Sequence, residues 1–325
     1  MDSAFVRQSQ VPNSRLRIVD GHCDTLQFIR RGTIEFRQGN NPTHLDLPRL
    51  KKGGVKVQFF AAFIHPDLGM KGVTRVLELV DAFHAFTRST DGIRAAYGYQ
   101  DILQFNEDGD IGAILTVEGG EALGESLGVL RMLHRLGVRV LTLTWNVRNA
   151  LGDGVLEGED RGLTGFGVEV VREMNRLGMI VDVSHLGPFS LNGVLDVSER
   201  PVLASHSNCH ALCPHPRNLT DDQITAIAAP GGVIGATFVP TMVSRTDPSL
   251  ERLLEHVDHL VRVGGIDCVA IGSDFDGFNG FLPGLKDAGE MGNLTTGLLE
   301  RGYNEYQVEK VLGGNLLRLI KDVVG

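Results

Sequence analysis

The sequence has few cysteines, no excess of positive charge and no long apolar run, and each shortage excludes a class of protein. Four cysteines scattered over 325 residues cannot form a disulfide framework, which indicates a reducing compartment, so we expect a cytoplasmic protein. The 31 basic residues are outnumbered by 40 acidic ones, and without a dense basic run we expect no nucleic-acid partner. No segment is apolar enough to span a bilayer or to act as a signal peptide, so we expect no membrane partner.

The composition is that of an ordinary globular chain. Hydrophobic residues make up 42% and charged residues 22%, which leaves enough apolar surface for a packed core. A length of 325 residues is large for one domain but suits an α/β barrel. We therefore predict a single barrel domain over 1–325, with an N-terminal extension over 1–17, that acts on a small-molecule substrate.

Short runs rich in Val, Ile, Ala and Thr predict strands that are buried on both faces, and longer stretches with a 3.6-residue period predict helices between them. The predicted strands span 18–24, 55–64, 111–118, 138–145, 179–185, 201–206, 232–238 and 268–274. The predicted helices span 73–87, 125–136, 167–177, 223–227, 249–263 and 305–324. Eight alternating units favour a closed parallel barrel over an open sheet, so the predicted fold is a (β/α)8 TIM barrel of the metal-dependent hydrolase type.

Ionisable side chains occupy the carboxyl ends of five predicted strands, which converge on one face of such a barrel. They are His22, Asp24, Glu118, His185, His206, Asp274 and Asp276. A single histidine at a strand end is often only a packing residue, but burying so many charged groups together without a cation would be costly. Imidazole and carboxylate suit zinc, and five such ligands exceed what one tetrahedral ion needs. The pattern therefore predicts two metal ions that share one carboxylate.

Other cysteines and histidines lack this alignment. Cys209 and Cys213 lie beside His206 and resemble half a zinc knuckle, but no second half completes a tetrahedral site. Cys23 lies between His22 and Asp24 with its side chain on the opposite side of an extended chain, which predicts a packing residue. We interpret the histidines on predicted helices as surface or packing residues: His84, His134, His256 and His259.

A series of short motifs resembles the renal, or membrane, dipeptidase family of zinc metallopeptidases, and the chain is most similar to its soluble microbial members. The motifs follow in family order over nearly the whole chain: DGHCD (20–24), TVEGGEAL (116–123), VDVSH (181–185), ASHSN (204–208), HPRNLTDDQ (215–223), IGSDFDG (271–277) and GGNLLR (313–318). Taken singly these motifs are weak, but their order and spacing together are highly specific.

The resemblance implies a metal-ligand set and a mechanism. It implies two Zn2+ ions per chain, or other divalent ions, one held by His22, Asp24 and Glu118 and the other by Glu118, His185 and His206. Glu118 would bridge the ions, and a hydroxide between them would be the nucleophile.

The same resemblance assigns two further residues and leaves a third in question. Asp274 matches the acid/base carboxylate of the family, and Arg217 matches the arginine that holds the substrate carboxylate. Where mammalian members have a substrate-contacting histidine after LTLT, this chain has Trp145, whose indole offers one neutral donor. The metals or Arg148, three residues on, would then have to compensate.

The predicted function is a metal-dependent dipeptidase, with a dipeptide as partner and a homodimer allowed. One alternative is an amidohydrolase acting on a cyclic amide, lactone or aminated base, because loops rather than the barrel choose the chemistry. That class is favoured by a lysine that ends the fourth strand, where this chain has Trp145. A second alternative is a non-catalytic protein that binds metal or a dipeptide, which the complete ligand set and Asp274 disfavour.

Overall fold

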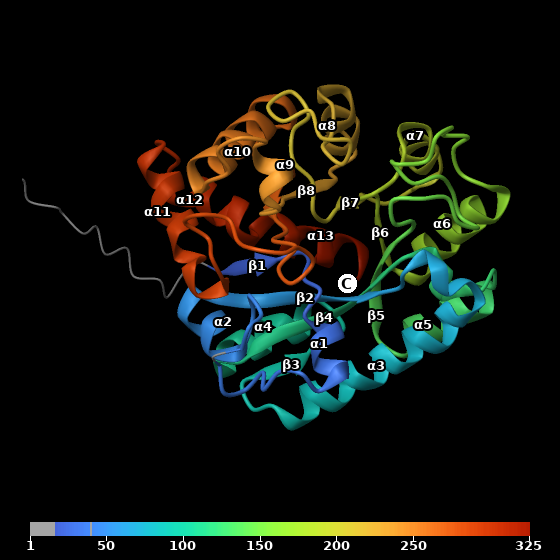
Figure 1. Ribbon diagram of the computed structural model, residues 1–325, viewed down its shortest axis with the longest axis horizontal. Helices are drawn as coiled ribbons and strands as arrows, with labels where there is room; N and C mark the ends of the chain where they lie inside the picture. The colour runs from blue at the N-terminus through green and yellow to red at the C-terminus, as the bar shows by residue number, and fades with distance from the viewer. Residues whose placement is uncertain (1–16, 40) are drawn as a thin grey trace, which may run out of the picture.

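Parallel strands close into a barrel in the computed structural model, which describes residues 17–39 and 41–325 (Figure 1). The barrel strands are β1 (Ile18–Asp20), β2 (Val55–Phe63), β4 (Ile111–Glu118), β5 (Val138–Thr142), β6 (Ile180–Asp182), β7 (Leu203–Ala204), β8 (Val233–Ala236) and β9 (Val269–Ile271). Closure follows from the pairing, because β1 pairs with both β9 and β2, and β2 pairs in turn with β4. The predicted eight-stranded barrel is confirmed.

A further strand, β3 (Ile93–Ala95), was not predicted from the sequence. It pairs with the first residues of β4, from Ile111 to Ala113, where β5 does not reach. Its burial is incomplete, since Arg94 is exposed, and three residues are too few to show a periodic pattern. The strand extends the sheet beside the barrel and takes no part in closing it.

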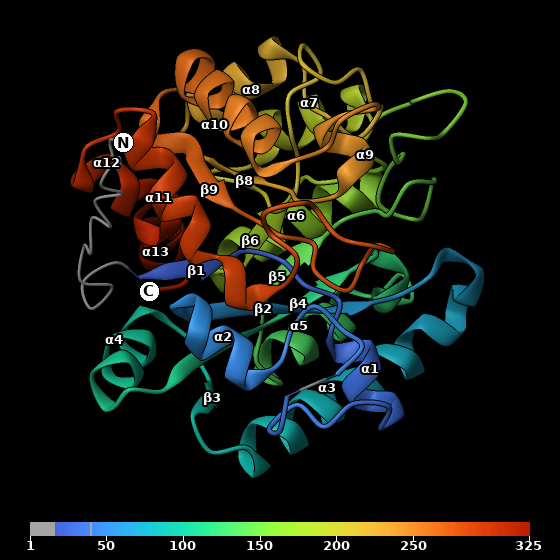
Figure 2. The same ribbon diagram turned by 60° about the vertical axis from the view of Figure 1, so that its left-hand side comes forward.

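Helices surround the strands, as Figure 2 shows from a second direction. Five predicted helices are confirmed within a few residues: α3 (Gly72–Ser89), α5 (Leu127–Arg135), α6 (Gly165–Leu177), α8 (Asp221–Ala228) and α10 (Leu250–Gly264). Six further helices were missed, most of them short: α1 (Leu26–Arg31), α2 (Leu47–Gly53), α4 (Tyr99–Asp108), α7 (Pro188–Val197), α9 (Pro240–Val243) and α11 (Gly292–Glu300). For α2 the local signal was present, because Asp46 caps the Arg49 amide and a proline follows it.

The last predicted helix is interrupted. It consists of α12 (Glu305–Glu309), a π-helical turn (Lys310–Gly314) and α13 (Asn315–Val323). A Cβ on Gly313 would lie 2.1 Å from the carbonyl oxygen of Arg17, so glycine is needed for this close approach to the start of β1. Leu316 and Ile320 of α13 join the apolar cluster inside the barrel, and the helix therefore closes its amino-terminal end.

The barrel strands end earlier than predicted, and the polar residues lie in the loops beyond them. β1 ends at Asp20, two residues before His22, and β6 ends at Asp182, three residues before His185. His185 and Asp274 have left-handed backbones, with φ of 71° and 61°, which breaks the regular ladder of a strand. The predicted convergence at one rim survives this correction, because each loop leaves the same end of the barrel.

Two further predictions concern the N-terminal extension and membrane-spanning helices. Residues 1–16 of the predicted N-terminal extension lie outside the described residues. Within the part of the chain that the structure describes, no helix is long and apolar enough to cross a membrane.

Candidate functional site

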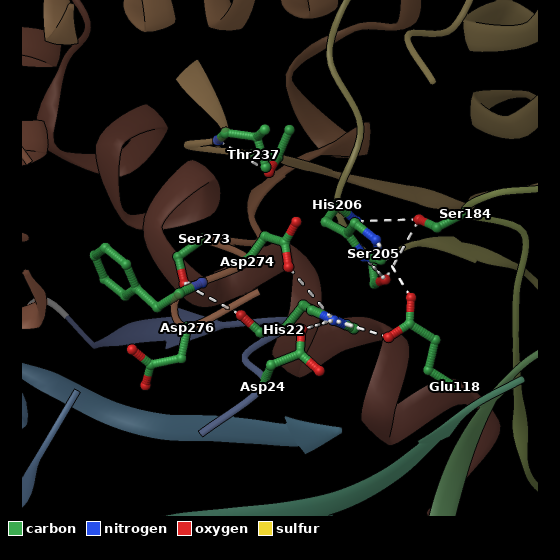
Figure 3. Close-up of polar contacts among 12 residues, drawn as sticks. His22, Asp24, Glu118, Ser184, Ser205, His206, Thr237, Ser273, Asp274 and Asp276 are labelled. Atoms are coloured by element: carbon green, nitrogen blue, oxygen red, sulfur yellow. Dashed lines mark hydrogen bonds and ion pairs between the residues drawn. The ribbon is translucent and has the colours of Figure 1, made fainter. Parts of the chain in front are cut away.

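Side chains from several loops meet at the carboxyl-terminal rim of the barrel (Figure 3). Glu118 is the last residue of β4, and its carboxylate lies between the imidazoles that follow β1 and β7. Its Oε2 atom is 3.6 Å from Nε2 of His22, and its Oε1 atom is 3.8 Å from Nε2 of His206. Asp24 and Asp274 lie on the other side of His22, with carboxylate oxygens 3.6 and 3.8 Å from its Nε2. The structure therefore places three carboxylates around one imidazole.

His185 completes the group. Its Nε2 atom lies 2.9 Å from Oε1 of Glu118 and 2.8 Å from Nε2 of His206. All five residues predicted as ligands from the sequence are thus brought together in space. Asp276, grouped with them at the strand ends, is turned away (Figure 3), and its carboxylate accepts hydrogen bonds from the Thr25 hydroxyl and the His44 amide.

The protonation of His185 and His206 is set by partners at their other ring nitrogens. Nδ1–H of His185 donates to the side-chain oxygen of Asn146 at 2.8 Å. The Ser205 hydroxyl donates to buried Asp182 at 2.6 Å, so it accepts from Nδ1–H of His206 at 2.7 Å. Both Nε2 atoms then carry lone pairs, which face each other and Glu118 without a proton between them. Such an arrangement fits a cation bound between them.

His22 supplies a second observation that fits a metal. Its Nε2 atom is buried and has no hydrogen-bond partner among the described residues, although three carboxylates surround it. A buried ring nitrogen without a partner is costly, and a first-row divalent ion would satisfy it together with Asp24 and Glu118. The chemistry of the donor set, nitrogen from imidazole and oxygen from carboxylate, is that of zinc sites.

Electrostatics favour the metal-binding forms of His185 and Glu118, whereas at His22 burial is outweighed by the charges of Glu118 and Asp24, which raise the pKa of His22. Burial, reinforced by the charge of Arg217, lowers the pKa of His185 to about 4. Burial opposes ionisation of Glu118, but the neighbouring imidazoles of His22 and His185 outweigh it and lower the pKa of Glu118. Neutral imidazole and ionised carboxylate are the states that coordinate metals.

Asp274 has the opposite electrostatic surroundings. Burial raises the pKa of Asp274 well above its ordinary value, His22 opposes this shift, and the nearby charges of Asp24 and Glu118 add to it. The backbone there is also unusual, since Asp274 and Asp276 both have left-handed backbones. Together with His185 they are three of the four non-glycine residues with positive φ in the described chain, and such strain is concentrated at functional sites.

Buried networks hold the loops that carry these side chains. Asp182, at the end of β6, accepts bonds from the amides of Ser184 and Ser205 and from the Ser205 hydroxyl. Asp20, at the end of β1, accepts bonds from the amide and hydroxyl of Ser273. Each carboxylate therefore ties its own strand end to that of another strand, and only the Asp182 network continues to an imidazole.

Arg217 lies beside the group. Its side chain is buried, and one guanidinium nitrogen donates to the carbonyl oxygen of His206 at 3.1 Å. Burial lowers the pKa of Arg217 to about 10, and the negative charges of Asp274 and Glu118 counter part of this shift. The charge of this guanidinium therefore acts directly on the group.

A cavity of about 270 Å³ opens onto these side chains. Trp145 lines it, and its ring centroid lies 6.2 Å from that of His185. The guanidinium of Arg148 instead binds the buried carboxylate of Asp153, and Arg148 is not among the described residues that line the cavity. The contribution of Arg148 to substrate binding stays a prediction, and its contact with Asp153 does not support it.

Sequence reasoning missed several residues at the site. Gln27, Phe28 and Arg31 line the cavity from α1, and Phe63 lines it from the end of β2. Gly277 was visible in the IGSDFDG motif, and its role is steric, because a Cβ there would lie 2.2 Å from Oδ1 of Asp274 and 2.5 Å from Oδ2 of Asp24.

The other cysteines and histidines pack as predicted where the structure tests them. Cys23 is fully buried within the main apolar cluster. His256 is buried and bonds to the Cys209 amide and the Val243 carbonyl, and His259 pairs with Asp221. Cys209 and Cys213 are buried, and neither belongs to a candidate metal-binding group within the described ranges.

The fold and the donor set of the site define the class of the protein: a metal-dependent hydrolase built on a TIM barrel. The chain belongs to the membrane dipeptidase family, peptidase family M19, whose model matches residues 7–324. The metallo-dipeptidase class predicted from the motifs is therefore confirmed.

Known relatives agree over almost the full chain. Dipeptidase verJ of Clonostachys rogersoniana is 34% identical over 328 residues, which cover 94% of this chain and 84% of that protein. A metallo peptidase from Rhodobacter sphaeroides, solved with a phosphinate mimic of the dipeptide L-Ala-D-Ala, is 30% identical with a TM-score of 0.87 and covers 95% of this chain and 99% of its own. The solved dipeptidase AC is 31% identical with a TM-score of 0.88 and the same coverage.

Proposed function

We propose that this protein hydrolyses the peptide bond of dipeptides with two zinc ions at the rim of the barrel. The observation that carries the proposal is the convergence of the buried Nε2 atoms of His22, His185 and His206 on the Glu118 carboxylate, that of His22 without a hydrogen-bond partner among the described residues. His22, Asp24 and Glu118 would hold one ion, and Glu118, His185 and His206 would hold the other. Two such ions lower the pKa of water and polarise a carbonyl oxygen when bound.

The remaining residues divide the other tasks. Asp274 would take the proton of the attacking water and pass it to the nitrogen of the leaving amine, a role that suits a carboxyl whose pKa burial raises above its ordinary value. Arg217 would hold the substrate carboxylate with two parallel N–H donors. Trp145 would form the wall of the cavity beside His185 and exclude water from the reacting bond.

The family and its relatives support a dipeptide over the two alternative readings. The Rhodobacter sphaeroides structure, which binds a mimic of L-Ala-D-Ala, shares the fold along almost its whole length. Membership of a peptidase family also disfavours the second alternative, in which the protein binds metal or a dipeptide without cleaving it.

Metal content and activity should be lost and restored together. We expect purified protein supplied with zinc to hold about two ions per chain by elemental analysis and to hydrolyse L-Ala-L-Ala or L-Ala-D-Ala. A strong chelator should remove both the ions and the activity, and zinc should restore both. A stoichiometry near one after zinc resupply, with full activity, would contradict the two-ion proposal.

Activity should also need a free carboxylate on the substrate. Loss of a charge-assisted hydrogen bond costs about 1.5 to 3 kcal/mol, so kcat/KM should fall by roughly ten- to a hundredfold when a dipeptide is replaced by its carboxyamide. Arg217→Lys should give a comparable loss with the free dipeptide, because lysine cannot copy the bidentate geometry. If Arg217→Lys still distinguishes the dipeptide from its amide as well as the wild type does, Arg217 does not bind that carboxylate.

A further inference from the structure

A second cavity adjoins the catalytic one. It measures about 630 Å³ and lies between the loop that contains His44 and the segment after β9 that contains Phe278 and Phe281. Phe28, Asp276 and Gly277 line both cavities, so the two share a wall beside the loop that carries Asp274. We call the second one the side cavity.

We propose that the side cavity binds a large apolar side chain on the amino-terminal residue of the substrate. The proposal rests on the dipeptidase function proposed above and specifies its substrate class. A dipeptide with small side chains would occupy the catalytic cavity of about 270 Å³, and a bulky side chain would extend past Phe28 and Gly277 into the larger space.

Most polar groups that line the side cavity already have partners within the protein. Nδ1 of His44 accepts from the Asp276 amide at 2.9 Å, and its Nε2–H donates to the Gly280 carbonyl at 2.6 Å. Both carboxylate oxygens of Asp276 are taken up by Thr25 and by the His44 amide. These groups fix the two walls to each other and have little capacity left for a ligand.

The charged residues are largely neutralised as well. The Arg49 guanidinium donates to the carbonyl oxygens of Asn41 and Thr43 and lies 3.5 Å from a carboxylate oxygen of Asp287. Lys286 is the one charged side chain of the lining that forms no ion pair among residues 17–39 and 41–325. An acidic substrate side chain would have to rely on this single exposed ammonium group, which favours an apolar occupant.

Three phenylalanine rings, those of Phe28, Phe278 and Phe281, contribute apolar surface to the side cavity. Phe278 stacks on His44 with ring centroids 5.0 Å apart, and Phe28 stands at the junction of the two cavities. Phe281 lines the side cavity and is 51% exposed. An apolar side chain in the side cavity would cover part of Phe281, and the burial of both surfaces would favour binding.

The direction of the substrate follows from the strands that carry each group. Arg217, proposed to hold the carboxylate, bonds to His206 after β7. The side cavity is lined instead by segments that follow β1 and β9, which are neighbours in the barrel and are separated from β7 by β8. The amino-terminal residue of the dipeptide therefore faces the side cavity.

Three dipeptides test the proposal in the zinc-loaded wild type. We expect kcat/KM for Phe-Ala to exceed that for Ala-Ala by roughly tenfold or more, and the preference to be absent for Ala-Phe. Equal rates for Phe-Ala and Ala-Ala, or a preference for Ala-Phe instead, would overturn the proposal. If Ala-Ala itself is not cleaved, the proposed function has failed, which is a separate outcome.

Two variants connect the preference to the side cavity. Phe281→Ala should lower the ratio of Phe-Ala to Ala-Ala at least about threefold, mainly through KM. Phe189→Ala is the matched control, because Phe189 is 66% exposed at the start of α7 and lines neither cavity. A ratio unchanged in Phe281→Ala, or lowered equally in both variants, would overturn the assignment. So would a preference for Glu-Ala over Phe-Ala that disappears in Lys286→Gln, since the cavity would then select acidic side chains.

Discussion

Asp274→Asn is expected to lower kcat for a dipeptide by about a hundred- to ten-thousand-fold while both metal ions stay bound. The amide has the shape of the carboxyl group but cannot accept a proton from water and return it to the leaving nitrogen. The raised pKa of Asp274, caused chiefly by its burial, places the group nearer the working range of an acid/base residue. Turnover and elemental analysis on the same preparation measure both parts of the expectation.

Asp276→Asn is the matched control for this variant. Asp276 lies two residues further on and shares the left-handed backbone, but its carboxylate binds Thr25 and the His44 amide instead of facing His22. We expect it to affect kcat far less than Asp274→Asn does. Near-normal turnover in Asp274→Asn would rule out the proton transfer, and loss of an ion would make Asp274 a metal ligand, as its distance of 3.8 Å from His22 allows.

The position of the site was predictable from the sequence because barrel topology brings strand ends together. Glu118 and His206 are 88 residues apart in the chain, yet each follows or ends a buried run of Val, Ile, Leu and Ala. In a closed barrel of parallel strands, residues at the carboxyl ends of the strands all lie at one rim. The sequence alone therefore sufficed to place the five predicted ligands together at one rim.

The details of the site depended on backbone conformations that carry weak sequence signals. The strand prediction ran to Asp274 because the segment begins as a buried run of Val, Ala and Ile, but β9 ends at Ile271 and the backbone at Asp274 is left-handed. The same local turn directs Asp276 away from the carboxylate group. Likewise, nothing in the spacing of Trp145 and Arg148 indicates that Arg148 bonds to Asp153, because that contact depends on how a long loop folds.

Glu118→Gln is expected to lower the affinity for zinc by more than about a hundredfold and to reduce activity in proportion. Removing even an outer partner of a metal ligand typically costs 10- to 100-fold in affinity, and this change neutralises the carboxylate placed to contact both ions. Among the described residues, Glu118 is also the one acidic group that faces His22, His185 and His206 together, at 3.6, 2.9 and 3.8 Å. The negative charge of Glu118 would therefore offset more of the positive charge of the bound ions than the negative charge of Asp24 would.

Competition with a chromophoric chelator measures this affinity, and thermal unfolding with and without zinc gives an independent reading. A ligand that binds only the folded state raises Tm, so zinc should stabilise the wild type far more than the variant. Glu121→Gln is the control, because Glu121 lies three residues further on and bonds to Asn149 at 3.3 Å, outside the candidate metal-binding groups of the described chain. If Glu118→Gln binds two ions as tightly as the wild type, Glu118 does not bridge the ions. If Glu121→Gln loses zinc to the same extent as Glu118→Gln, the loss reflects a change in the whole loop and not the loss of the bridging carboxylate.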